Sequence, residues 1–462
     1  MSEDLAMFAI DTMQSEGADF SDIRIEKTSS NFIEIGNGDV KEARSAIITG
    51  AGLRAFKNGS WAFAQTTDLS KEGLRSAAED VARIVKRISK DVEADYELET
   101  KTHKAKSSHD IRIPFDDVSI DDKVSYLQGL NHQALTHSEL VQRVRITYEE
   151  QTIDLQIYNS YGTSISLTHS LPYLKSFVYT KDGANLQRGV KLVGGSGGFE
   201  IISGERGHTA TEEASELAVK LLTAKQAKGG VQDIITDPDL TGVLVHEAFG
   251  HGCEGDNWTA QGSVFIGKFG EQIGYEGVTI IDDPTLKGLR GSFEYDWEGT
   301  KTKKRVLIKN GVMNELLHSI DTASQLNMEA NGAGRAQSFM YEPIPRMGNT
   351  ILQPGSYNLE EMISDLKSGL LMCGMGGGYA ISDVGQYMFR STHGFEIING
   401  ELGDMVRGAS ILGQHLKTLS KIDAIGKELE LFPGTCGKGN QLVPDMSGGP
   451  HIRIRDMNVG GA

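Results

Sequence analysis

Glycine constrains the fold of this chain more than any other residue: it occupies 55 of the 462 positions, whereas proline occupies only 10. Because glycine lacks a Cβ atom, its backbone reaches conformations closed to other residues and lets a second backbone approach closely. Tight turns and β-bulges use both properties. The glycine density therefore favours a sheet-rich fold over a helical bundle.

Hydrophobic periodicity in the N-terminal half predicts helices together with strands. Apolar residues recur at helical spacing from Leu74 to Val85, which predicts an amphipathic helix over residues 72–88. The other patterns predict a short helix at the start of the chain, a strand over residues 22–35, a hairpin turn at Asn58-Gly59, a polar loop over residues 93–114, a second helix over residues 123–137 and an antiparallel meander over residues 141–193.

A change of pattern near residues 200 to 230 predicts a domain boundary. A helical segment over residues 211–228 ends at Gly229-Gly230, and a glycine-punctuated, strand-rich remainder follows it. That remainder shows hairpin signals at Asn310-Gly311 and Asn399-Gly400 and one helical segment over residues 359–370. Since the chain exceeds the size at which one core keeps growing, we expect an α+β protein of two domains. These are an α/β N-terminal domain over residues 1–200 and a largely antiparallel β C-terminal domain over residues 230–462.

Charge and composition argue against several classes of function. The 46 basic and 63 acidic residues give a net charge of −17, which repels nucleic-acid backbones and anionic lipid surfaces. The N-terminus has no basic region, and no apolar run approaches the roughly 20 residues of a membrane helix. Three cysteines cannot form a disulfide framework in a chain of this length. We therefore expect a cytoplasmic protein that binds neither nucleic acid nor membranes.

Two histidines and a glutamate stand together in a glycine-rich segment of the C-terminal half. Glu247 follows His246 directly, and His251 comes five positions after His246. On a regular helix residues four apart lie about 40° from each other, whereas residues five apart lie about 140° from each other and cannot share an ion. A π-type bulge or an unwinding turn would insert the extra residue and bring the two imidazoles together, and Gly250 and Gly252 make that distortion easy.

This combination of residues suits metal-dependent hydrolysis. Neutral imidazoles bind zinc, a third protein ligand completes the set, and a fourth position is left for water. Glu247 is placed to take a proton from that water, while the metal polarises the scissile carbonyl. Spacing alone does not decide the matter, because His132 and His137 have the same gap without the glutamate and are expected on a helix surface. For the third ligand Glu254 is an equal candidate from spacing alone. A thiolate such as that of Cys436 is a strong zinc ligand, but a lone cysteine is usually a buried core residue.

The segment from His246 to Asp256 (HEAFGHGCEGD) closely resembles the signature of the TldD/PmbA family of metallopeptidases. Four further blocks resemble motifs of that family in the same order: Pro343 to Thr350 (PIPRMGNT), Gly376 to Gly378 (GGG), Arg407 to Gly413 (RGASILG) and Cys436 to Gln441 (CGKGNQ). The resemblance covers residues 243–462 closely, and the N-terminal half resembles the family more loosely.

The resemblance implies a metal site and a function. It implies that His246, His251 and Cys436 bind one Zn²⁺ per active subunit and that Glu247 is the catalytic base. It further implies a two-domain build with the metal-site helix in the C-terminal domain, and hydrolysis of peptide bonds in unfolded or flexible polypeptides. The subunit would form homodimers, or heterodimers with a metal-free TldD/PmbA paralogue.

The neighbouring residues have structural interpretations. Cys253 and Cys373 are expected to be small buried side chains rather than ligands. Glu254 and Asp256 are expected to orient His251 or nearby backbone amides.

Two other functions compete with the peptidase. The chain could be a non-catalytic partner subunit of a peptidase dimer, although the paired histidines, the glutamate and the late cysteine are all present. It could also be another metal-dependent amide hydrolase or an iron(II) enzyme, because two histidines and one further ligand suit several chemistries. A thiolate ligand beside a glutamate favours hydrolysis.

Overall fold

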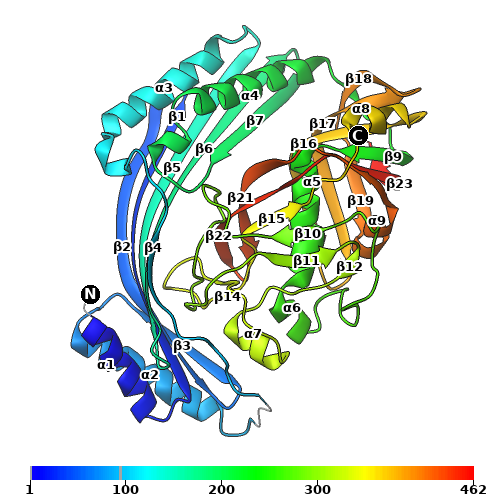
Figure 1. Ribbon diagram of the computed structural model, residues 1–462. Helices are drawn as coiled ribbons and strands as arrows, with labels where there is room; N and C mark the ends of the chain where they lie inside the picture. Colours follow the sequence, from blue (N-terminus) through cyan, green and yellow to red (C-terminus); the bar gives the residue numbers. More distant parts are fainter. Residues whose placement is uncertain (1–2, 93–95, 462) are drawn as a thin grey trace.

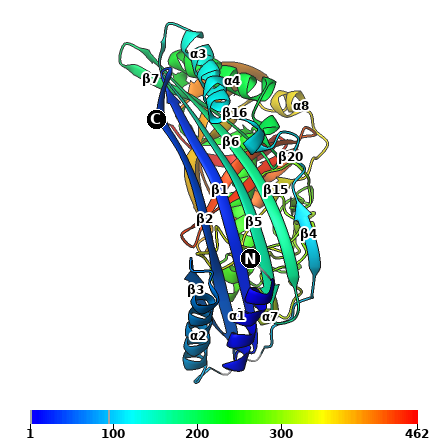
Figure 2. The same cartoon turned by 90° about the vertical axis from the view of Figure 1, so that its left-hand side faces the viewer.

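A computed structural model describes residues 3–92 and 96–461, and its fold is α+β with several domains (Figure 1). The N-terminal half forms a seven-stranded, mainly antiparallel sheet of order β3-β2-β1-β5-β6-β4, in which β7 also pairs with β6. Its long strands bend into an arch that partly surrounds the C-terminal half (Figures 1 and 2). The strands are β1 (Phe20–Gly36), β2 (Asp39–Lys57), β3 (Ser60–Thr66), β4 (Lys104–Ser108), β5 (Val141–Asn159), β6 (Ser164–Asp182) and β7 (Asn185–Gly194).

Two pairs of helices pack at the two ends of the arch (Figure 1). At one end α1 (Glu3–Ser15) and α2 (Lys71–Ile88) bury their apolar faces against β1, β2 and β3. At the other end α3 (Ile120–Thr136) and α4 (Glu205–Thr223) pack on β5, β6 and β7. The middle of the arch is left for contacts with the C-terminal half, which form a core cluster of their own.

The C-terminal half contains two larger sheets with a short helix between them. One sheet has the order β12-β11-β10-β15-β22-β21, and the other has the order β16-β9-β23-β19-β17-β18-β8, with β20 paired to β23. Helix α5 (Pro238–Leu244) packs against β22 of the first sheet and β16 of the second. The largest apolar core of the protein surrounds this helix.

The elements of the C-terminal half range from strands of 2 residues, such as β12, to β16 with 14 residues. The strands are β8 (Lys225–Gln226), β9 (Gly230–Thr236), β10 (Ile280–Asp282), β11 (Arg305–Lys309), β12 (Val312–Met313), β13 (Gly334–Arg335), β14 (Ile344–Pro345), β15 (Asn349–Leu352), β16 (Ser368–Ile381), β17 (Gln386–Ile398), β18 (Glu401–Arg407), β19 (Ser410–Gln414), β20 (Ile422–Ile425), β21 (Glu430–Lys438), β22 (Gln441–Gly449) and β23 (Ile452–Gly460). The helices are α6 (Gly255–Thr259), α7 (Ile320–Gln325), α8 (Leu359–Ser364) and α9 (His415–Lys421). None of the helices in residues 3–92 and 96–461 combines the length and the apolar character that a membrane span needs.

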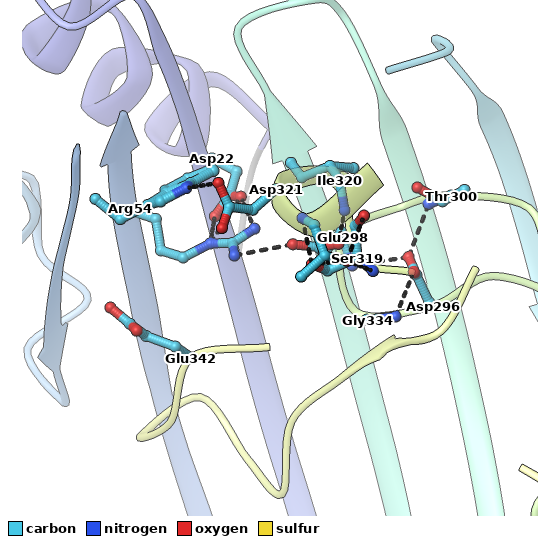
Figure 3. Close-up of polar contacts among 12 residues, drawn as sticks. Asp22, Arg54, Asp296, Glu298, Thr300, Ser319, Ile320, Asp321, Gly334 and Glu342 are labelled. Carbon is cyan, nitrogen blue, oxygen red and sulfur yellow. Dashed lines mark hydrogen bonds and ion pairs between the residues drawn. The ribbon is translucent and has the colours of Figure 1, made fainter. Parts of the chain in front are cut away.

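A buried network of charges ties the arch to the C-terminal half (Figure 3). Arg54 of β2 forms an ion pair with Asp22 of β1 and donates to Glu298 at 2.9 Å. The other oxygen of Glu298 accepts a hydrogen bond of 2.7 Å from the backbone N–H of Ile320, the first residue of α7. Because one buried guanidinium bridges two buried carboxylates, loss of Arg54 would leave both acids buried without the cation that contacts them. The network therefore fixes α7 relative to β1 and β2.

The secondary structure confirms most of the predicted elements. The amphipathic helix over residues 72–88 is α2, the helix over residues 123–137 is α3, and the meander over residues 141–193 is formed by β5, β6 and β7. Asn58 joins β2 to β3 with a φ of 46°, as its predicted hairpin turn requires.

Three segments differ from their predicted structure. Helix α4 begins at Glu205 rather than at residue 211, directly after Gly204, and it ends at Thr223 because β8 follows. Helix α8 ends at Ser364, since the chain from Ser368 onward pairs with β17 as β16. The polar loop predicted over residues 93–114 contains β4, which pairs in parallel with β6; residues 93–95 of that loop lie outside the described residues.

Close contact between α5 and β22 depends on glycine. A Cβ atom on Gly242 would lie 2.6 Å from both the Cα and the N of Gly448 in β22. These are backbone atoms, so neither partner can rotate away. The helix that leads into the predicted metal site is therefore held at a distance that only glycine permits.

We predict that Gly242→Ala lowers the free energy of unfolding by about 1–3 kcal/mol, as overpacking in a dense core does. Gly129→Ala is the matched control, because Gly129 lies on the exposed side of α3 with nothing near the added methyl group. That variant should gain about 0.5–1 kcal/mol from helix propensity. Midpoints of chemical unfolding measure both changes, and equal midpoints for the two variants would contradict the packing argument.

His415 is fully buried in the core around α5. Its ring lies 6.3 Å from those of Phe249 and Phe265 and 6.0 Å from that of Tyr387. Neither ring nitrogen has a hydrogen-bond partner among the described residues. Burial disfavours the imidazolium and lowers the pKa of His415 to about 4.

We predict that His415 makes the protein less stable in acid. The unfolded chain takes up a proton at this residue near pH 6.5, whereas the folded chain resists it until about pH 4, so stability rises with pH between these values. Protonation of the unfolded chain at this residue alone can lower the free energy of unfolding by an amount on the order of 3 kcal/mol. His415→Leu should therefore lose less unfolding free energy between pH 7 and pH 4.5 than the wild-type protein, as measured by urea unfolding. An identical loss in both proteins would show that His415 does not titrate in this way.

Candidate metal centre

The predicted bulge lies between His246 and His251. Helix α5 continues into a π-helical turn, η3 (Val245–Gly250), and then into a 3₁₀ turn, η4 (His251–Cys253). In the π turn the backbone N–H of His251 donates to the carbonyl of His246, five residues earlier. The two imidazoles consequently lie on the same side of the helix, with ring centroids 5.2 Å apart.

A glycine lets the π turn pack closely against the chain after β14. A Cβ atom on Gly250 would lie 2.1 Å from the sulfur of Met347, which is itself fully buried. A larger residue would therefore require either the Met347 side chain or the turn to shift. Gly250 is one of the two glycines that the sequence pattern singled out. Its backbone has ordinary right-handed helical angles, so its role in the structure is in packing.

Cys436 of β21 completes a set of three donors. Its sulfur lies 3.4 Å from Nε2 of His251, and the donor atoms of His246, His251 and Cys436 lie within 4.8 Å of one another. In a tetrahedral zinc site with ordinary bond lengths, a sulfur and a nitrogen ligand are about 3.5 Å apart. The three residues therefore fit a zinc ion in spacing and in chemistry. His246 and Cys436 are both only 3% exposed.

The other two cysteines lie in apolar cores. Cys253 belongs to the large cluster around α5, and Cys373 belongs to a smaller cluster that includes Ile235 and Met362. Burial raises the pKa of both thiols. The structure thus agrees with their expected role as small buried side chains.

A carboxylate lies behind each histidine. Oε2 of Glu254 is 2.8 Å from Nδ1 of His251, and Oδ2 of Asp445 is 3.3 Å from Nδ1 of His246, without the alignment of a hydrogen bond. Carboxylates in this position fix the ring so that Nε2 faces the metal. Glu254 therefore orients His251, as expected, and its carboxylate lies on the side of the ring away from Cys436.

Sequence reasoning missed Asp445 and Lys438. Asp445 lies opposite Gly434 in the β21–β22 hairpin, on the same face as Cys436. Lys438 forms ion pairs with Glu254 at 2.9 Å and with Asp256 at 2.6 Å. Asp256 also accepts a hydrogen bond of 3.0 Å from the backbone N–H of Asn257, so it contacts this lysine and a nearby amide rather than His251. A strand alternation argument from Cys436 would have placed Lys438 on the same face, since the two residues are two positions apart. The position of Asp445 could be predicted only from the pairing register of the β21–β22 hairpin.

Electrostatics around the candidate ligands oppose the effect of burial. Burial lowers the pKa of His246, but the charges of Cys436 and Asp445 outweigh it and raise the value to about 9. Burial likewise raises the pKa of Cys436, but His246 and His251 hold it well below its usual range. The donor set thus stabilises a thiolate beside positive charge, and a divalent cation can take the place of the imidazole protons.

The two carboxylates behind the imidazole rings, those of Glu254 and Asp445, differ in their pKa values. Burial raises the pKa of Glu254, but Lys438 and His251 overcome this and lower it to about 2. At Asp445 burial dominates and raises the pKa to about 6, in spite of the opposing charge of His246. Glu254 is therefore the more firmly ionised of the two.

Glu247 lies at the open side of the candidate centre. Its Oε2 is 3.8 Å from Nε2 of His251, the nitrogen that faces Cys436. Its side chain is 35% exposed, whereas those of His246 and His251 are 4% and 12% exposed. A carboxylate in this position can exchange protons with solvent and with a bound substrate.

Comparison with known proteins identifies the family. Three family models match the chain: the PmbA/TldA metallopeptidase C-terminal domain at residues 229–461, domain 1 at residues 21–85 and the central domain at residues 113–222. A protein of Methanothermobacter thermautotrophicus named metalloprotease is 35% identical, with 96% of each chain covered. A protein of Saccharolobus solfataricus named zinc metalloprotease TldD homolog is 26% identical, with 96% of this chain and 97% of that protein covered.

Two crystal structures share the fold. A putative modulator of a DNA gyrase from Thermotoga maritima has a TM-score of 0.81 and 21% identity, covering 99% of this chain and 100% of its own. TldE from Thermococcus kodakarensis has a TM-score of 0.74 and 16% identity, covering 99% of both chains. These likenesses confirm the expected α+β fold.

The family models and the curated relatives define the class of this protein, which is that of the metallopeptidases. The chain belongs to the PmbA/TldD family, as its sequence motifs indicate.

We predict that Cys436→Ala abolishes stoichiometric metal binding, with a loss of affinity greater than the roughly 10- to 100-fold typical when a residue behind a ligand is changed. Cys253→Ala is the matched control, since Cys253 is buried only two positions from His251 but lies in the apolar core. Metal content after dialysis, measured by mass spectrometry, distinguishes the two variants. Equal metal content in both would remove Cys436 from the ligand set.

Proposed function

We propose that this protein is a zinc-dependent peptidase in which His246, His251 and Cys436 hold one Zn²⁺ per subunit and Glu247 is the general base. The observation that supports this most strongly is the convergence of one thiol and two imidazoles, with a glutamate at the open side. A relative of similar length is named a zinc metalloprotease, which agrees with zinc as the ion.

The chain's own residues would divide the work of hydrolysis. Zinc held by these ligands supplies a Lewis acid and lowers the pKa of water. Glu247 would accept a proton from the attacking water at its carboxylate and return it to the leaving amine. Glu254 and Asp445 would keep the two imidazoles oriented, because each faces an Nδ1 atom.

We propose unfolded or flexible polypeptides as substrates. The donors are nearly buried, so the scissile bond of a folded protein surface could not reach them. An extended chain is thin enough to enter such a site and can be held by backbone hydrogen bonds with little side-chain preference.

We further propose that the subunit works in the cytoplasm as a homodimer or as a heterodimer with a metal-free TldD/PmbA paralogue. One protein with the same fold is named TldE, which supports the search for a paralogous partner. The three cysteines are unpaired, as suits a reducing compartment. Light scattering of the protein, alone and mixed with a paralogue, determines the assembly. We also propose that the domain boundary lies between residues 200 and 230, near β8.

A different metal-dependent amide hydrolase is the second candidate function, because the same donors would serve any amide bond. The non-catalytic subunit is less favoured, since all three donors and Glu247 converge.

We predict that Glu247→Gln retains its metal and loses peptide cleavage by about 10²- to 10⁴-fold, the usual contribution of a general base. Cleavage of unstructured peptides is followed by mass spectrometry, with zinc analysis of the same sample. Removal of zinc by a chelator should also stop cleavage in the wild-type protein, and added zinc should restore it. Undiminished cleavage by Glu247→Gln would exclude the proposed base, and intact peptides under all conditions with cleavage of small amides would favour the second candidate.

A further inference from the structure

The candidate ligands come from two distant segments of the chain. His246 and His251 lie on the helical segment after α5, whereas Cys436 lies on β21, 185 residues after His251. A metal can hold such segments together only after it has bound. Before that, other contacts must set the distance between the sulfur and the imidazoles.

Lys438 makes such a contact. It lies two residues after Cys436 on β21, so the side chains of the two residues point to the same face of the strand. Its ammonium group reaches Glu254 at 2.9 Å, Asp256 at 2.6 Å and the backbone carbonyl of Pro345 at 3.0 Å. The contacts with Asp256 and Pro345 are hydrogen bonds donated by the ammonium, and the contact with Glu254 is an ion pair.

Glu254 contacts both Lys438 and a candidate ligand, His251. The same oxygen, Oε2, that is 2.9 Å from Lys438 is 2.8 Å from Nδ1 of His251. Glu254 is fully buried, and its backbone forms a β-bridge with Leu317. The carboxylate is thus held on a fixed backbone between the strand that carries Cys436 and the ring of His251.

We propose that Lys438 is a positioning residue that braces β21 against the helical segment and thereby presets the distance between Cys436 and His251 for the metal. The proposal rests on the proposed metal site. Loss of the ammonium would leave Glu254 buried without the cation that contacts it and would release β21 from the helical segment, so the distance between Cys436 and His251 would no longer be preset. The metal should then dissociate faster, although each ligand remains in place.

The experiment follows the transfer of Zn²⁺ from the full-length protein to a chromogenic chelator. Lys438→Met should release zinc about 10 to 100 times faster than the wild-type protein, as is typical when a group behind a ligand is removed. Lys438→Arg keeps the charge and should restore part of the retention. Lys268→Met is the matched control, since Lys268 also forms a 2.8 Å ion pair with a glutamate, Glu271, but on the exposed surface. It should release zinc at the wild-type rate.

A double-mutant cycle shows whether Lys438 acts through Glu254. Glu254→Gln alone should also accelerate release, and Lys438→Met added to it should have little further effect, because the brace is already broken. The absorption spectrum of the Co²⁺-loaded protein gives a second readout, since a shifted ligand geometry changes the visible bands. If Lys438→Met does not fold, Lys438→Gln serves in its place.

The outcomes separate this proposal from the proposed function. Release by Lys438→Met within about twofold of the wild-type rate, with an unchanged Co²⁺ spectrum, overturns the brace while the metal site stands. Additive effects in the double mutant also overturn it, since Lys438 would then act independently of Glu254. Failure of the wild-type protein to bind Zn²⁺ or Co²⁺ overturns both proposals.

Discussion

The π turn at Val245–Gly250 is the constraint on which the rest of the candidate centre depends. With ordinary α-helical hydrogen bonds, His246 and His251 would project from different sides of the helix. The bond from the N–H of His251 to the carbonyl of His246 adds one residue to the turn and aligns them. The packing around this turn accommodates its unusual path, since Gly250 gives room to Met347 and Gly242 lets the preceding helix meet β22. The local distortion and the surrounding close contacts therefore require each other.

Much of the fold could be predicted because its signals are local. The helix α2 follows from apolar spacing, and the β2–β3 hairpin follows from Asn58-Gly59, whose backbone adopts the positive φ of a tight turn. The strand β4 could not be predicted this way, because its sequence is polar and it exists through pairing with β6. The helix predicted over residues 359–370 is longer than α8 for the same reason, since Ser368 begins a strand that pairs with β17. Elements made by partners distant in sequence leave a weak local pattern.

The residues of the candidate centre also differ in how well the sequence alone predicts them. The two histidines and Glu247 lie close together in the sequence. Their spacing and the neighbouring glycines therefore predict both the site and its bulge. The choice between Glu254 and Cys436 as the third donor depended on resemblance, because the contact that decides it joins residues 185 positions apart. Asp445 left no sequence signal of its own. It lies near His246 only because the β21–β22 register places it opposite Gly434.

The arch and the candidate centre are joined by a short path through the C-terminal half. Glu298, held by Arg54 of the arch, accepts the N–H of Ile320 at the start of α7. Three residues earlier, Leu317 forms the β-bridge with Glu254, the carboxylate behind His251. Since the side chains of Glu298 and Glu254 are both buried and both paired with cations, neither can move without exposing an unbalanced charge. The segment from Leu317 to Ile320 therefore connects the arch to Glu254, the residue behind His251 in the candidate metal centre.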